Sequence, residues 1–293
     1  MWIILFFLSG CKVKTKEMQP GCKVNHRQFF RKKLFLSNKM YIFAKRKGKY
    51  MGEKMIHRIE DIEQMALETG FLPFFYCGID GLSIEEHTPR ELWFSDEQDG
   101  PWEWKGPLIG MGSLAYGKLY NGKAGFVSLE WLPDLLNYRR SCYAFPYNEV
   151  EREVFDTVVS HQTMLTKDIK RECGFVRPRA PKLSPMEREA LRDTPRSLWP
   201  KGGEARNRGF ETIITRLQMS LRFVVADFEY NYDREGKRYG WGVARYTTPE
   251  LMYGEEMFNV DRTPEKSLQR IITHLNKKLP YAAEWQIEKI IVG

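Results

Sequence analysis

The side chains best suited to chemistry are hydrogen-bond donors that recur between residues 206 and 238. Guanidinium, ammonium and amide groups donate hydrogen bonds to phosphate oxygens and to base edges. The donors are Arg206, Arg208, Arg216, Gln218, Arg234, Lys237 and Arg238. Together they predict a surface that binds nucleic acid. The alternative is an ordinary solvated surface, because carboxylates such as Glu211 and Glu235 dilute the positive charge.

Two tryptophans could contact an unpaired base. Trp102 and Trp104 flank Glu103 in the run GPWEWKGP, and we interpret residues 93–109 around them as a loop. Exposed aromatic side chains in such a loop can stack on bases that have left the duplex. The alternative, which we favour, is that both indoles pack on a hairpin at residues 113–128 and fix the loop.

Three carboxylates in GIDGLSIEEH are candidates for catalysis: Asp80, Glu85 and Glu86. A carboxylate can orient a water molecule or stabilise a developing cation if its neighbours aim it at the reacting atoms. The alternative is a salt-bridged or solvated loop. The sequence has no glycine-rich phosphate loop in context and no nucleophile elbow. The cysteines beyond residue 54 are too far apart in sequence for a metal-binding pair, so we expect neither a metal nor a cofactor.

The elements that must position these groups are three helices and a hairpin. Apolar residues recur at helical spacing in three segments, residues 148–161, 164–175 and 210–221. The period changes to two in residues 226–250, where Gly236 suits the positive φ of a hairpin tip. This order, apart from an insertion, is that of a winged helix, whose third helix enters the major groove of DNA. We expect the bulky face of the hairpin, with Tyr239 and Trp241, to pack on the helix at 210–221.

The chain is predicted to have an α+β fold of tandem winged-helix-like units with a long β-hairpin wing. Its predicted parts are an α+β winged-helix-like unit at 55–145, a winged helix at 146–262 with a proline-rich basic insertion at 176–205, and a helical tail at 263–293. In the first unit, Asn121-Gly122 lies between alternating apolar residues and predicts a tight hairpin turn.

Residues 1–54 carry the chain's excess of positive charge. They contain 14 Lys and Arg against two Asp and Glu, whereas the other 239 residues contain 32 against 36. A nucleic-acid surface on the body must therefore be a local patch. We interpret residues 1–54 as a disordered basic leader, which a misplaced start codon would produce. A lipoprotein signal ending at Cys11 and a genuine basic arm are the alternatives.

The apolar run at the start of the chain bears on localisation. From Trp2 to Leu8 it is too short to span a bilayer, and no positive charge precedes it as a secretory signal requires. We therefore expect a cytoplasmic protein that does not enter the membrane.

Three stretches together resemble the AlkZ-related proteins. They are GPWEWKGPLIG with LAYGKLYNGKAGFVSLEWLPDLLNYRR, then FETIITRLQMSLRFVVADFEY, then GKRYGWGVARYTTPE. The resemblance covers residues 55–293. It implies tandem winged helices and the activity of AlkZ-type DNA glycosylases, which remove alkylated bases and unhook crosslinks without a metal or cofactor. The partner it implies is duplex DNA, including damaged duplex, and we expect a monomer.

The sequence departs from the AlkZ-type catalytic signature, which is Gln-x-Gln or Gln-x-Asp on a strand. No glutamine of the body starts that pattern, and the nearest match, Gln286-Ile287-Glu288, falls in a predicted tail helix. No catalytic residue is therefore carried over from the family. The alternatives to a glycosylase are a winged-helix regulator that binds DNA without catalysis and a protein-interaction module.

Overall fold

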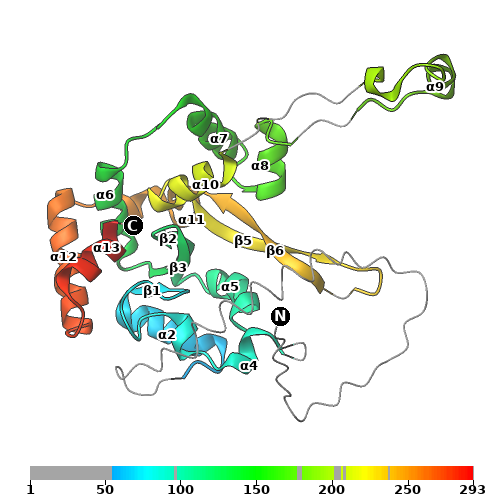
Figure 1. Ribbon diagram of the computed structural model, residues 1–293. Helices are drawn as coiled ribbons and strands as arrows, with labels where there is room; N and C mark the ends of the chain where they lie inside the picture. The colour runs from blue at the N-terminus through cyan, green and yellow to red at the C-terminus, as the bar shows by residue number, and fades with distance from the viewer. Residues whose placement is uncertain are drawn as a thin grey trace, which may run out of the picture. The chain divides into compact units, whose positions relative to one another are not determined.

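The computed structural model describes residues 55–95, 98–176, 180–200, 206, 209–236 and 238–292. The predicted leader, together with Arg208 and Lys237, lies outside these residues. Contacts along the chain separate residues 1–49 from residues 50–293, and every element below belongs to the second unit. This unit contains helices and two small antiparallel sheets, in agreement with the predicted α+β class (Figure 1).

The first sheet has the strand order β1-β3-β2 and lies beside helix α2. The strands of this sheet and the helices between and before them are, in chain order, α2 (Ile59–Thr69), β1 (Phe71–Pro73), α3 (Ile84–His87), α4 (Arg90–Trp93), α5 (Pro101–Gly110), β2 (Leu114–Tyr120) and β3 (Lys123–Ser128). The apolar face of α2 buries Ile62, Met65 and Ala66. Asn121 and Gly122 both have positive φ between β2 and β3, which confirms the predicted hairpin turn.

Residues 101–110 form helix α5, so the prediction of a loop around the two tryptophans is wrong. The N–H of Gly100 donates to Glu103 Oε2 at 3.1 Å, and Pro101 occupies the first helical turn, where its missing N–H costs nothing. Pro107 lies inside this segment. In the fold it sits near the end of a short helix and is exposed.

The second sheet has the strand order β4-β6-β5 and follows the predicted succession of helices. Its elements are α7 (Glu149–Ser160), β4 (Met164–Leu165), α8 (Thr166–Glu172), α9 (Pro185–Ala190), the 3₁₀ turn η1 (Arg196–Leu198), α10 (Phe210–Met219), β5 (Val224–Tyr232) and β6 (Arg238–Thr247). The predicted positive φ at the hairpin tip is present at Gly236, where φ is 76°. Strands β5 and β6 form the long hairpin seen in Figure 1.

The hairpin does not pack on α10 through its bulky face as expected. Trp241 instead meets Trp102 of α5 edge to face, with ring centroids 5.3 Å apart. Both Tyr239 and Trp241 remain 54% exposed. The reason is that the first sheet occupies the neighbouring space: α10 packs on β2, and α5 runs beside β5.

The remaining helices form a layer on the first sheet. They are α6 (Leu132–Cys142), α11 (Pro249–Tyr253), the 3₁₀ turn η2 (Glu255–Phe258), α12 (Pro264–Lys278) and α13 (Glu284–Val292). One apolar core joins α2 and the first sheet to α7, α8, α10 and β6, and a second lies between that sheet and α6, α12 and α13. Thr263 Oγ1 accepts from the N–H of Lys266 and so caps the start of α12.

Arg139 is the largest side chain that is fully buried among the described residues, and it joins α6 to three other elements. Its guanidinium donates to the carbonyls of Leu119 on β2, Met219 at the end of α10, and Ile290 and Ile291 near the end of α13, at 2.6–3.2 Å. The final carbonyls of a helix have no partner within the helix. A single cation therefore satisfies the ends of two helices.

Gly70 ends α2 at a position that tolerates no larger residue. Its φ is +77°, and a Cβ there would lie 2.6 Å from Cδ1 of Trp131. We expect Gly70→Ala to lower the free energy of unfolding by about 2–4 kcal/mol, through the left-handed backbone and the clash with the indole. Gly112→Ala is the matched control, because its φ is +75° and nothing lies within 4 Å of its Cβ. Chemical denaturation of both variants checks this; equal losses would contradict the clash.

The described residues were compared with the requirements of a membrane-spanning helix and of a metal site. Among those residues, no helix combines the length and the apolar composition needed to cross a bilayer. In the same part of the chain, no three His, Cys, Asp or Glu side chains gather as metal ligands would.

Candidate nucleic-acid interface

The donors predicted to bind nucleic acid lie around α10 and the β5–β6 hairpin. Helix α10 buries Phe210, Ile214 and Leu217 and turns its other face outward. The spacing of the apolar residues thus decides which polar side chains reach solvent. Arg234 lies exposed in the turn that joins β5 to β6.

Three of the predicted arginines are paired with carboxylates. Arg206 Nη1 lies 2.6 Å from Glu153 Oε2, Arg238 Nη2 lies 2.6 Å from Asp99 Oδ1, and Arg216 Nε lies 3.2 Å from Glu151 Oε1. The first two pairs are substantially exposed. Exposed ion pairs contribute about 0–1 kcal/mol, so a phosphate can replace the carboxylate at little cost.

Arg216 is held differently from the other two arginines. Its partner Glu151 has a side chain only 2% exposed, and Arg216 Nη2 also donates to the carbonyl of Ala144 at 2.7 Å. The guanidinium further lies over the ring of Tyr147, 4.5 Å from its centroid. Moving Arg216 toward DNA would leave a buried carboxylate unpaired, which is costly. Arg216 therefore serves the packing of α10 against α7.

Gln218 is not on the outward face of α10, so its placement among the exposed donors is wrong. It follows Ile214 by four residues and is 1% exposed. Its Oε1 accepts from the N–H of Lys118 on β2 at 3.0 Å, and its Nε2 donates to the carbonyl of Ile214 at 3.0 Å. The amide thus joins α10 to the first sheet.

The two tryptophans lie on α5 and are partly buried. Trp102 is part of an aromatic cluster in which its ring centroid lies 5.4 Å from that of Phe74, 5.5 Å from that of Trp93 and 5.3 Å from that of Trp241. Trp104 packs against the same core. Both indoles therefore pack in the fold, which is the alternative that we favoured. The partners of Trp102 are not confined to the predicted hairpin, because they include Trp93 of α4 and Trp241 of β6.

Two of the three candidate carboxylates, Glu85 and Glu86, accept backbone hydrogen bonds near α3. Glu86 accepts hydrogen bonds from Ser83 Oγ at 2.6 Å and from the N–H groups of Ser83 and Gly81, and it forms a capping box with Ser83, the N-cap of α3. Glu85 accepts from the N–H of Tyr76 at 3.0 Å, and Asp80 is exposed. Glu85 and Glu86 thus fix the loop before α3 and α3 itself, a structural use of these two carboxylates.

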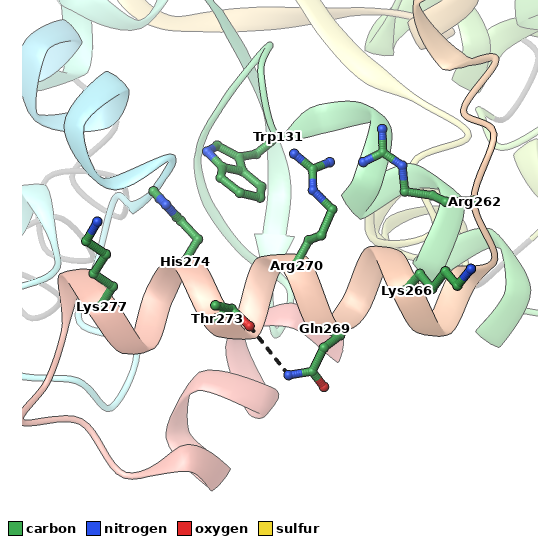
Figure 2. A pocket seen from close by; sticks show the side chains of 8 residues that line it. All are labelled: Trp131, Arg262, Lys266, Gln269, Arg270, Thr273, His274 and Lys277. Carbon is green, nitrogen blue, oxygen red and sulfur yellow. Dashed lines mark hydrogen bonds between the residues drawn. The ribbon is translucent and has the colours of Figure 1, made fainter.

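A second cationic surface, which the sequence analysis did not identify, lies along α12. It is an open hollow of about 610 Å³ (Figure 2). Its lining residues are Trp131, Arg262, Lys266, Gln269, Arg270, Thr273, His274 and Lys277. The signal was present in the sequence, since cations recur four residues apart at 262, 266 and 270 and again at 277. The helix at 264–278 was assigned only as a tail.

A family model described as AlkZ related matches residues 56–292. No curated protein and no solved structure matches the chain. The match runs from just before α2 to the end of α13 and therefore includes both sheets. It confirms the resemblance found in the sequence.

Proposed function

Because the chain belongs to the AlkZ-related family, we propose that it is a winged-helix protein that binds duplex DNA and is related in function to AlkZ-type DNA glycosylases. The observation that carries the proposal is the order α7, β4, α8, α10, β5, β6, with its β4-β6-β5 sheet, inside the region that the family model matches. A winged helix has this succession, with its third helix in the major groove and its hairpin beside the DNA backbone.

In this proposal the hairpin provides the main phosphate contacts of the winged helix. Arg234 is exposed in its turn, and the ion pair of Arg238 with Asp99 can exchange the carboxylate for a phosphate. Arg206, which precedes α10, can likewise exchange its carboxylate partner Glu153 for a phosphate. The outward face of α10 then lies toward the groove.

Base removal is the part of the family's activity that this chain's residues support least. The AlkZ-type Gln-x-Gln or Gln-x-Asp signature does not occur in residues 55–293. A glycosylase must orient a water molecule and stabilise positive charge on the sugar once the base has left the stack. Glu85 and Glu86 are instead engaged in the loop around α3. These facts favour, as a second candidate function, a regulator that binds DNA without excising bases.

The hairpin contacts make a direct prediction. We expect Arg234→Ala/Arg238→Ala to weaken duplex binding several-fold and to reduce the salt dependence by about two phosphate contacts. Fluorescence anisotropy with a labelled duplex between about 50 and 200 mM salt measures both quantities. Arg58→Ala is the control, because Arg58 also pairs with a carboxylate, Asp61, but lies before α2. Failure of the wild-type chain to bind duplex DNA at low salt would refute the proposed function.

Two further arms complete that experiment. A chain that begins at Met55 separates binding by the body from attraction to the basic residues 1–54. Incubation of the full chain with alkylated duplex, followed by a test for abasic sites, distinguishes a glycosylase from a protein that only binds.

A further inference from the structure

Three cationic side chains of α12 and one that precedes the helix line one hollow, here called the α12 groove. Arg262, Lys266, Arg270 and Lys277 all line it (Figure 2). From Lys266 to Lys277 the helix rises by about 16 Å. Phosphates of one DNA strand advance about 3.4 Å along the duplex axis and also turn around it, so a groove of this length faces a few consecutive phosphates. The spacing therefore suits an extended polyanion.

Two of these cations are held in place from beneath. Asp134 on α6 has a side chain only 2% exposed; it pairs with Arg262 at 3.0 Å and also with Arg270. Each guanidinium has five N–H donors, so donors remain that do not contact the carboxylate. The guanidinium of Arg270 also lies 5.2 Å from the ring centroid of Trp131. Fixing both side chains in advance lowers the entropy lost when a ligand binds.

The groove has a true excess of positive charge. Among the described residues, its four lining cations form ion pairs with one carboxylate, Asp134, and a second carboxylate, Glu130, acts on His274; residues 55–293 as a whole contain more acidic than basic side chains. Within the described part of the chain, the ammonium groups of Lys266 and Lys277 pair with no carboxylate. The arginines around α10 and on the hairpin differ, since Arg206, Arg216 and Arg238 each have a carboxylate partner.

The aromatic floor of the groove indicates what kind of contact it makes. Trp131 is only 7% exposed, and His274 stacks on it with ring centroids 4.2 Å apart. Because Arg270 also lies over this indole, no open aromatic face is left for a base. The imidazole is itself fixed by a contact of its Nε2 with the carbonyl of Thr69 at 2.9 Å. The groove can therefore contact phosphates through its cationic side chains but cannot stack on a base.

We propose that the α12 groove binds the sugar–phosphate backbone of duplex DNA, as a second contact surface beyond α10 and the hairpin. This inference rests on the proposed function, because it assumes that the partner is duplex DNA. Contacts of this kind fix the position of the protein on the duplex and add affinity that is independent of base sequence. They also make binding strongly dependent on salt.

The test is Lys266→Ala/Lys277→Ala in the full chain, compared with Lys278→Ala/Lys289→Ala. Both variants lose two exposed lysines, but Lys278 and Lys289 do not line the groove. We expect the groove variant to reduce the slope of log K against log salt by about two and to weaken duplex binding about tenfold or more near 0.1 M salt. The control variant should keep the wild-type slope. Thermal unfolding of both variants checks that each is folded.

The outcomes separate this inference from the proposed function. Wild-type binding with equal slopes for the two double variants would overturn the groove and leave the proposed function standing. No duplex binding by the wild-type chain would overturn both. If hairpin and groove contact one duplex, the losses from Arg234→Ala/Arg238→Ala and from the groove variant should add, because the sites are separate. Loss of binding in the groove variant alone would support the groove and contradict the hairpin.

Discussion

Replacement of Arg139 by methionine should lower the free energy of unfolding by about 3–5 kcal/mol, because three buried carbonyls and one partly buried carbonyl lose their donor at once. Those carbonyls belong to β2, to the last residue of α10 and to the end of α13. Water cannot replace the guanidinium, since Arg139 is completely inaccessible. Burial lowers the pKa of Arg139 to about 10, so it is positively charged at neutral pH.

Two other substitutions, Arg139→Lys and Arg140→Met, test whether the loss depends on the guanidinium of Arg139. Arg139→Lys should not restore stability, because one ammonium cannot match the fork of donors that serves three elements. Arg140→Met is the neighbouring control: Arg140 pairs with Glu250 and donates to the carbonyl of Leu221, but it remains partly exposed. Its loss should be about 1–2 kcal/mol. Urea denaturation measures all three, and a loss below about 1 kcal/mol for Arg139→Met would contradict the argument.

Replacement of Lys105 by methionine should have the opposite effect and raise the free energy of unfolding at pH 7 by about 1–2 kcal/mol. Lys105 is also buried, but within the described residues it donates to no carbonyl or carboxylate. Its Nζ lies 4.5 Å from the ring centroid of Phe228 and 5.1 Å from that of Trp102. These cation–π contacts offset only part of the desolvation cost. Methionine keeps the unbranched shape and removes the charge.

The gain from Lys105→Met should depend on pH in a defined direction. Burial lowers the pKa of Lys105 from 10.5 to about 8, against a smaller opposing effect of Glu103. Between these two values the unfolded chain binds the proton and the folded chain does not, so rising pH stabilises the wild-type protein relative to the variant. The advantage of the variant should therefore be full below pH 8 and shrink as pH rises toward 10.5. Equal differences in stability at pH 7 and pH 10 would contradict this reasoning.

The regular elements were the most predictable part of the fold. The apolar spacing in α7, α8 and α10 predicted helices, and Asn121-Gly122 predicted the β2–β3 turn. These signals are local, because a helix or a tight turn is formed by residues that are neighbours in sequence. The run from Pro101 to Gly110 was predicted to be a loop because its glycines and prolines are typical of turns, yet Gly100 and Glu103 cap a helix there.

The candidate sites were less predictable, because they depend on which side chains meet across the fold. Arg216 and Arg238 look equivalent in sequence, yet one pairs with a buried carboxylate of α7 and the other with an exposed one before α5. Gln218 is polar, but its position on α10 turns it into the interface with β2. Such pairings join residues far apart in the chain, and periodicity carries no information about them.

The sequence by itself determined the family, the succession of helices and strands, and the requirement that any DNA contact on the acidic body be a local patch. Those properties follow from composition, from short-range spacing and from the likeness of whole segments. Only the tertiary structure decided where positive charge stays uncompensated. It paired Asp134 of α6 with Arg262 and Arg270, and it paired Arg206 and Arg238 with carboxylates of their own. The reason is physical: the field at a surface is a sum over neighbours in space, and folding chooses those neighbours.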